Sequence, residues 1–245
     1  YHQEPMSFDA LLSWCQGQAK RFTPYICDVG AFLKAAYDGG KNIVLEAQLG
    51  AMRDIDYGIF PFTSSSSTLA AYAPLGAGIP NCRLDHVVGV LKAYSTCVGA
   101  GPFAAERAMP EKWNEQLRKA GGEYGAATGR PRRVGPFDAV ASRYGLACQG
   151  ADKIALTKLD VLSGMREIPV IVGYTQNGVQ GTDFDPLSDL DQAEPIVTML
   201  PGWQCDLSDC KSWDELPQQA KDYVAFLEQQ LGHEIQFVST GAERE

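Results

Sequence analysis

The hydrophobic residues of this chain recur at spacings that predict helices separated by short strands. Residues 7–38 are expected to be helical with a break near residues 23–25, because apolar residues return there every three or four positions. Residues 136–147 show helical periodicity too, whereas residues 54–67 lack any apolar period and are expected to form a loop.

The clearest helical pattern covers residues 212–231. Ser212 and Glu215 match the capping-box pattern that begins many helices, and Gly232 is placed to end this one. Apolar residues between these signals form a single stripe, which predicts a helix with one buried face.

Short runs of apolar residues between the helices predict strands that are buried on both faces. Such strands are typical of parallel sheets covered by helices. We therefore expect an α/β fold with a mostly parallel sheet flanked by helices. The expected strands cover residues 42–46, 87–94, 154–160, 168–174 and 235–238.

Composition narrows the possible classes of protein. The 245 residues are 45% hydrophobic and 21% charged, which is ordinary for a globular protein. No apolar run reaches the ~20 residues that a membrane span needs. The net charge of −9 argues against a nucleic-acid partner, but it does not exclude a local site for a small anionic ligand. The seven cysteines are odd in number and include no C-x-x-C pair, which argues against a disulfide framework or a zinc ribbon and favours a reducing, cytoplasmic location. We also expect no membrane partner.

Two polar segments follow expected strands, where ligands bind in parallel sheets. In the segment Thr157-Lys158-Leu159-Asp160, the carboxylate could accept hydrogen bonds from N1–H and the exocyclic amine of guanine, while the lysine stem covers the ring. The alternative is a solvated turn. The segment Ser239-Thr240-Gly241 lets backbone approach a ligand closely, or forms an ordinary turn.

Two further clusters of charge have both a chemical and a structural interpretation. Arg130, Arg132 and Arg133 form an arginine cluster in an acidic chain, which indicates either a small anionic ligand or a solvated loop. Asp54 and Asp56 could serve acid–base or metal chemistry, but we favour turns stabilised by their carboxylates.

These segments, taken together and in order, resemble the adenylosuccinate synthetase family from about residue 20 to the end. The similarity is specific because several motifs occur at family-like spacing, and it implies a P-loop-GTPase-like ligase fold. The matching segments are D-I-D-Y-G-I-F-P-F-T-S-S (54–65), L-K-A-Y-S-T (91–96), V-G-A-G-P-F (98–103), G-E-Y-G-A-A-T-G-R-P-R-R (122–133), L-T-K-L-D-V-L (156–162), L-P-G-W (200–203) and S-T-G (239–241).

The resemblance implies the ligation of L-aspartate to IMP at the expense of GTP, in the synthesis of AMP. GTP would phosphorylate the IMP ring oxygen to give 6-phosphoryl-IMP, and aspartate would displace the phosphate, leaving adenylosuccinate, GDP and phosphate. Arginines and Mg²⁺ would balance the charge of three anionic substrates. A homodimer is also implied.

The family's binding residues map onto positions of this chain. The resemblance implies that Lys158, Asp160, Ser239 and Gly241 bind GTP. It implies that the following residues bind IMP or aspartate: Gln48, Thr63, Val98, Thr128, Arg130 and Arg132. Departures from the family pattern include the early position of the glutamine at residue 48, Ala127 in place of a threonine, Cys97 in place of an arginine and Ala242 in place of a proline.

The family's glycine-rich phosphate loop, catalytic aspartate and histidine, and Mg²⁺ ligands have no counterpart in this sequence. We therefore expect residues 1–245 to be the C-terminal part of a single synthetase domain, incomplete at its N-terminus and inactive alone, with no catalytic residue or metal ligand of its own. One alternative is a non-catalytic module that binds a purine nucleotide or a partner chain. A small GTPase is disfavoured, because its P-loop is missing and the arginine cluster has no role in it.

Overall fold

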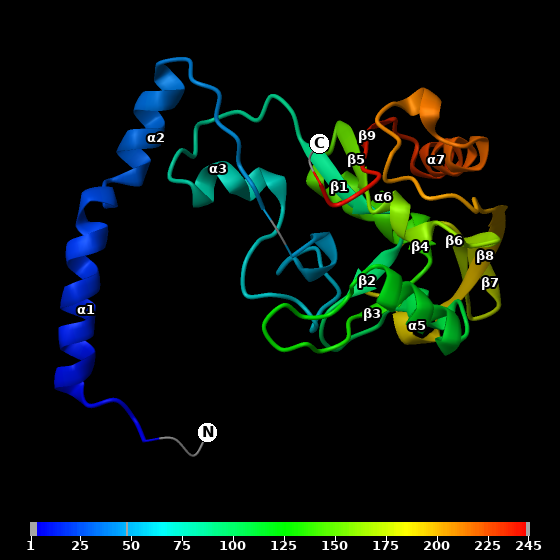
Figure 1. Ribbon diagram of the computed structural model, residues 1–245, viewed down its shortest axis with the longest axis horizontal. Coiled ribbons are helices and arrows are strands. Elements are labelled where there is room, and N and C mark those ends of the chain that lie inside the picture. Colours follow the sequence, from blue (N-terminus) through cyan, green and yellow to red (C-terminus); the bar gives the residue numbers. More distant parts are fainter. Residues whose placement is uncertain (1–3, 48, 244–245) are drawn as a thin grey trace. The chain divides into compact units, whose positions relative to one another are not determined.

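A computed structural model describes residues 4–47 and 49–243, and the chain divides into two compact units. The first unit, Tyr1–Leu45 and Ala73–Arg83, is helical. The predicted helical segment with a break near residue 23 is confirmed, since two helices flank a 3₁₀ turn there. The elements are α1 (Phe8–Phe22), η1 (Thr23–Tyr25), α2 (Val29–Asp38) and α3 (Ala73–Gly76) (Figure 1).

The second unit, Glu46–Tyr72 and Leu84–Glu245, contains a three-stranded sheet in which all strands run parallel. Its order is β1-β5-β9, with β1 at Val88–Lys92, β5 at Lys153–Thr157 and β9 at Ile235–Val238 (Figure 1). These strands confirm three of the predicted ones. Because the strands are parallel, the polar segments that follow them meet at one edge of the sheet.

A second sheet is centred on β6 (Glu167–Gln176), the fourth predicted strand. It pairs in parallel with β4 (Phe137–Asp138) and antiparallel with β7 (Val179–Gly181) and β8 (Glu194–Pro201). A separate antiparallel ribbon joins β2 (Ser95–Cys97) to β3 (Arg133–Gly135). The α/β class with a mostly parallel sheet and flanking helices is confirmed, and the antiparallel strands add to it.

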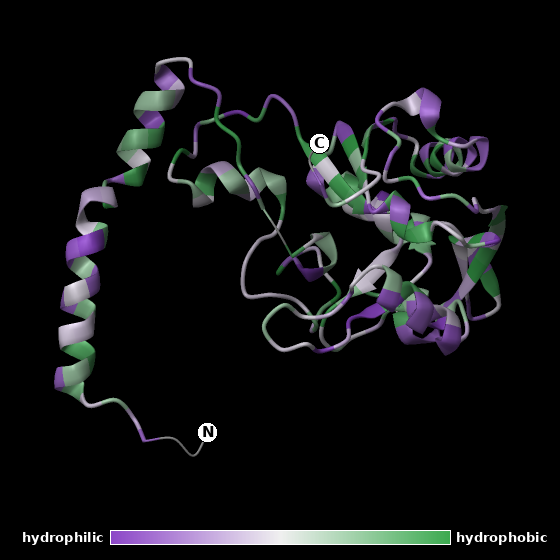
Figure 2. Ribbon diagram, viewed as in Figure 1, coloured by the Kyte–Doolittle hydropathy of each residue, from purple (hydrophilic) through white to green (hydrophobic). Residues whose placement is uncertain are grey.

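Helices and short 3₁₀ turns fill the rest of the second unit. The helix α7 (Gln218–Leu231) combines hydrophobic and hydrophilic residues (Figure 2) and buries its apolar face, including Tyr223 and Leu227, in the main core. None of the described helices is long and apolar enough to span a membrane. The remaining elements are η2 (Ala51–Arg53), η3 (Ala70–Tyr72), α4 (Ala104–Arg107), α5 (Glu111–Ala120), α6 (Ala139–Gln149), η4 (Leu159–Leu162), η5 (Leu190–Gln192), η6 (Trp213–Glu215) and α7 (Gln218–Leu231).

The predicted strand at residues 42–46 is wrong. This segment is irregular, and Val44 in its centre is 91% exposed. An apolar run forms a strand only where a neighbouring strand pairs with it, and no described strand pairs with these residues.

The predicted capping box at the start of the last helix is also wrong. The helix α7 begins at Gln218, because Pro217 holds Leu216 in an extended conformation and separates α7 from the turn η6. Glu215 instead accepts a hydrogen bond from the backbone N–H of Lys211 at 2.7 Å. The predicted end is confirmed, since Gly232 adopts the left-handed conformation with φ of 70°.

Candidate functional site

Two of the predicted segments lie side by side at the carboxyl edge of the parallel sheet. The lysine turn (residues 157–160) follows β5, and the serine–glycine loop (residues 239–241) follows β9. The N–H of Ser239 donates to the carbonyl of Leu156 at 2.8 Å, and the N–H of Leu159 donates to the carbonyl of Ser239 at 3.2 Å. The strand register alone therefore brings Lys158, Asp160, Ser239 and Gly241 together.

The lysine turn has an unusual backbone and an accessible carboxylate. Lys158 has φ of 62°, a left-handed conformation that residues with a side chain seldom adopt and that often occurs at binding sites. Its ammonium group donates to the carbonyl of Gly121 at 2.7 Å. Asp160 is partly exposed, and no described side chain forms a hydrogen bond with its carboxylate. Asp160 can therefore accept hydrogen bonds from a ligand.

The serine–glycine loop is held by its own hydroxyl groups. Ser239 Oγ donates to the carbonyl of Gly241 at 3.0 Å, and Thr240 Oγ1 donates to the carbonyl of Cys210 at 3.1 Å. These bonds fix the loop beside the lysine turn.

A fully buried carboxylate, Glu123, lies at the centre of a charged cluster beside the lysine turn. Its Oε1 accepts hydrogen bonds from Lys92 Nζ at 2.8 Å and from the Tyr94 hydroxyl at 2.7 Å. Lys158 Nζ lies 3.3 Å from the same oxygen, and Arg132 Nη1 donates to Oε2 at 2.8 Å. The Glu123 cluster thus contains three cations, one hydroxyl and a single carboxylate.

Contacts within the cluster shift the pKa values of Glu123 and Lys92. Burial alone would raise the pKa of Glu123, but the hydrogen bonds from Lys92 and Tyr94 and the nearby cations hold it at about 2. Burial lowers the pKa of Lys92, and contact with Glu123 opposes that change. Glu123 is therefore ionised throughout the physiological range.

We expect the Glu123 carboxylate to contribute to the pH dependence of stability. Its pKa in the folded protein, about 2, lies below its ordinary value of 4.5. The contribution is therefore fully present above pH 4.5 and is lost as the pH falls from there through about 2. It amounts to roughly 3 kcal/mol. Urea unfolding of the full-length protein between pH 3 and pH 6 measures the larger part of this loss, with Glu123→Gln as the comparison. Equal pH dependence in both proteins would contradict this assignment.

The arginine loop (residues 124–133) carries three arginines in different environments. Its base is closed by pairing of Tyr124 with Pro131. Arg132 binds Glu123, and Arg133 binds Glu106 through Nε at 2.7 Å and the carbonyl of Gly101 at 2.7 Å.

The tip of the arginine loop is exposed. Among the described residues, no carboxylate forms an ion pair with Arg130. Thr128 Oγ1 is 3.4 Å from the N–H of Arg130, and the N–H of Gly125 donates to the carbonyl of Arg130 at 2.8 Å. The turn therefore presents the Arg130 guanidinium to solvent, where an anionic ligand can reach it.

Asp54 organises the loop that follows it. Its buried carboxylate accepts hydrogen bonds from the N–H groups of Asp56, Tyr57 and Thr68 and from the Ser67 hydroxyl, at 2.7–3.0 Å. Burial raises its pKa, but these hydrogen bonds outweigh burial and lower it. The structural interpretation of Asp54 is confirmed.

Arg53 joins the loop that carries Thr63 to the loop that carries Val98. Its Nη1 donates to the carbonyls of Phe62 and Ala100, and its Nη2 donates to the carbonyl of Val98 at 3.0 Å and to Cys97 Sγ at 2.9 Å. Thr63 is partly exposed and Val98 is 69% exposed, so both can contact a ligand.

Gln48 lies outside the described residues. The described residues also contain no group of three or more His, Cys, Asp or Glu side chains that could hold a metal ion. We assign no Mg²⁺ ligand to the described residues.

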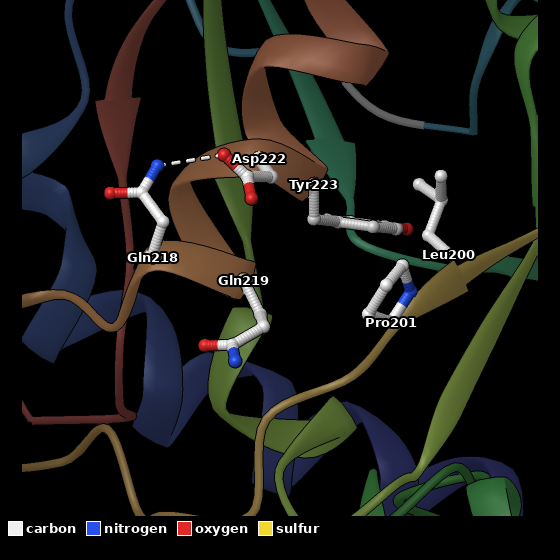
Figure 3. A pocket seen from close by; sticks show the side chains of 6 residues that line it. All are labelled: Leu200, Pro201, Gln218, Gln219, Asp222 and Tyr223. Carbon is white, nitrogen blue, oxygen red and sulfur yellow. Dashed lines mark hydrogen bonds between the residues drawn. The ribbon is translucent and has the colours of Figure 1, made fainter.

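A cavity of about 280 Å³ lies between the end of β8 and the start of α7 (Figure 3). Gln218 donates to Asp222 at 2.7 Å along its rim. None of the predicted binding residues lines it. Its lining residues are Leu200, Pro201, Gln218, Gln219, Asp222 and Tyr223.

Glu123 and Arg53 are the residues that sequence reasoning missed. Glu123 lies in a motif of the resemblance, but its partner Lys92 is 31 positions away. The only sequence signal was a glutamate just before an arginine cluster. Arg53 gave no signal, because it donates mainly to backbone carbonyls.

Comparison with known proteins gives a consistent result over the whole chain. The sequence profile described as adenylosuccinate synthetase matches residues 1–245. Adenylosuccinate synthetases from Frankia casuarinae and Thermomicrobium roseum are 42% and 40% identical over 247 aligned residues, and each alignment covers 100% of this chain. The chain spans 57% and 56% of the length of these two relatives.

A solved structure agrees with the sequence comparisons. The fully ligated adenylosuccinate synthetase from Plasmodium falciparum is 33% identical and superposes with a TM-score of 0.87, covering 96% of this chain and 57% of that one. The chain belongs to the adenylosuccinate synthetase family.

Proposed function

We propose that this chain carries the guanine- and aspartate-binding part of a ligase that joins L-aspartate to IMP with GTP as phosphoryl donor. The products are adenylosuccinate, GDP and phosphate, formed through 6-phosphoryl-IMP. The observation that carries the proposal is the meeting of the lysine turn and the serine–glycine loop at one sheet edge, next to the Glu123 cluster that holds Arg132.

Asp160 is the proposed acceptor for guanine. Its partly exposed carboxylate has two oxygens for N1–H and the exocyclic amine of the base, a donor pair that adenine lacks. The Lys158 stem covers the ring, and Ser239 and Gly241 approach from the adjacent loop. This arrangement favours GTP over ATP, because adenine would leave the carboxylate without donors.

Aspartate and IMP are the proposed ligands of the other two loops. Arg130, Arg132 and Thr128 offer donors for the carboxylates of L-aspartate, and Arg130 also lies near the IMP ribose in the proposed complex. Thr63 would bind the IMP phosphate, and Val98 would pack against IMP and aspartate. Gln48 is proposed as a further IMP contact.

The chemistry needs a better leaving group than a ring carbonyl oxygen, and phosphorylation of that oxygen supplies one. The proposed role of this chain is to bind and orient the three substrates, with the catalytic groups and Mg²⁺ ligands outside it. We further propose that residues 1–245 are the C-terminal part of a single domain in a cytoplasmic homodimer, and that this chain alone does not turn over.

A turnover assay of the full-length gene product tests the activity. IMP, L-aspartate, Mg²⁺ and either GTP or ATP are supplied, and adenylosuccinate is measured by its absorbance change. Product that requires GTP is expected. A folded protein that binds GDP but forms no product would instead favour the alternative, a non-catalytic purine-nucleotide-binding module.

Arg130→Leu is expected to impair the use of aspartate specifically. Loss of a charged hydrogen bond costs about 1.5–3 kcal/mol, so kcat/KM for aspartate should fall by about 10- to 150-fold. The KM for GTP should change little. Arg166→Leu, at another exposed arginine, is the matched control. Unchanged aspartate kinetics in Arg130→Leu would show that the loop assignment is wrong.

A further inference from the structure

The Glu123 cluster links two segments that the proposed function gives to different substrates. Arg132 belongs to the arginine loop, and Lys158 belongs to the lysine turn. Both contact the same carboxylate, Arg132 at 2.8 Å through Oε2 and Lys158 at 3.3 Å through Oε1. One buried side chain therefore fixes the distance between the two cations.

The Glu123 carboxylate offsets the positive charge of the three cations around it. Lys92, Arg132 and Lys158 surround Glu123, whose side chain has no exposed surface. Without the negative charge, three cations would repel one another across a space of a few ångströms. Arg132 and Lys158 are still 35% and 38% exposed, so both retain surface that a ligand can reach.

The backbone supports the same arrangement. The carbonyl of Glu123 accepts the N–H of Arg132 at 2.9 Å, and the carbonyl of Gly121, two residues earlier, accepts Lys158 Nζ at 2.7 Å. A Cβ atom at Gly121 would lie 2.3 Å from the Tyr94 hydroxyl, so this turn packs closely against the cluster. The segment of residues 121–123 thus contacts both substrate segments.

We infer that Glu123 is a positioning residue that aligns Arg132 for aspartate and Lys158 for guanine, and so couples the two substrate sites. The inference rests on the proposed function. Glu123 does not touch a substrate itself; it acts through the two cations. The loop that carries Thr63 is held by Arg53 and Asp54, and neither of these contacts Glu123.

The test is the pattern of KM values in Glu123→Gln, measured on the full-length enzyme. The KM for aspartate and the KM for GTP should each rise at least about tenfold, whereas the KM for IMP should change less than about threefold. Glu115→Gln is the matched control, because it removes an exposed carboxylate on the helix α5 that lies outside the Glu123 cluster. An equal rise in all three KM values, or no rise, would overturn the inference.

A second variant guards against failure of Glu123→Gln to fold. Tyr94→Phe removes the one hydrogen bond that a neutral donor makes to the Glu123 carboxylate, and it leaves the charges of the cluster unchanged. It should raise the KM values for aspartate and GTP together by about threefold, with IMP unaffected. Unchanged KM values in a folded Tyr94→Phe enzyme would overturn the inference too.

The wild-type enzyme separates the two possible failures. If the wild type forms no adenylosuccinate, the proposed function fails first. If the wild type is active and the variants show the wild-type pattern of KM values, only the coupling through Glu123 fails.

Discussion

Asp160→Asn is expected to reduce kcat/KM for GTP at least about 100-fold. The amide keeps one acceptor oxygen, but its NH₂ group faces the exocyclic amine of guanine, donor against donor. Loss of a charged hydrogen bond and the unmatched donor together cost about 3 kcal/mol or more. The variant should fold normally, because the carboxylate of Asp160 has no hydrogen-bond partner among the described residues.

The same exchange should change which base is preferred. Xanthine presents N1–H as a donor and O2 as an acceptor, which matches the oxygen and NH₂ of asparagine. Kinetics with GTP, XTP and ATP measure the change, with the exposed Asp183→Asn as control. The ratio of kcat/KM for XTP to kcat/KM for GTP should rise in Asp160→Asn and stay unchanged in Asp183→Asn. A preserved preference for GTP would remove Asp160 from the guanine site.

Trp203→Ala is expected to destabilise the protein by about 3–5 kcal/mol. Trp203 is 1% exposed, and its ring packs edge-on against Tyr223 with centroids 5.9 Å apart. Its indole N–H donates to Ser163 Oγ at 3.1 Å, and its carbonyl accepts the N–H of Gly164 at 2.9 Å. Truncation would leave a cavity beside Tyr223 and Ser163.

Trp213→Ala is the matched control for this effect. Trp213 has the same side chain but is 48% exposed. Chemical unfolding of both variants of the full-length protein compares the two free energies of unfolding. A similar decrease in the free energy of unfolding in both variants would show that the burial of Trp203 is not the cause of the destabilisation.

The regular elements of the fold could be predicted where local pattern and burial agree. The strands β1, β5, β6 and β9 and the helix α7 follow from apolar runs and from one apolar stripe. Residues 42–46 have the same kind of pattern but lack a paired strand, and pairing depends on distant residues. The predicted start of α7 is wrong because the capping pattern at residues 212–215 does not take account of Pro217, which prevents a helix from continuing through Leu216.

The part of the candidate site that follows predicted strands could be located from the sequence. Lys158 and Ser239 follow expected parallel strands, so both are expected at the carboxyl edge of the sheet. That their strands, β5 and β9, are direct neighbours comes from the structure. Glu123 could not be identified, because burial of a charge depends on which cations surround it in space. The cluster pattern treats Arg130, Arg132 and Arg133 as one group, whereas their contacts divide them between solvent, Glu123 and Glu106.

Amide hydrogen exchange of the full-length protein with and without GDP tests the guanine site most directly. GDP should slow exchange in the lysine turn and in the serine–glycine loop, and leave residues 62–68 unchanged. The protection should be lost in Asp160→Asn. Protection by GDP that spares both the lysine turn and the serine–glycine loop would contradict a guanine site at the carboxyl edge of the parallel sheet.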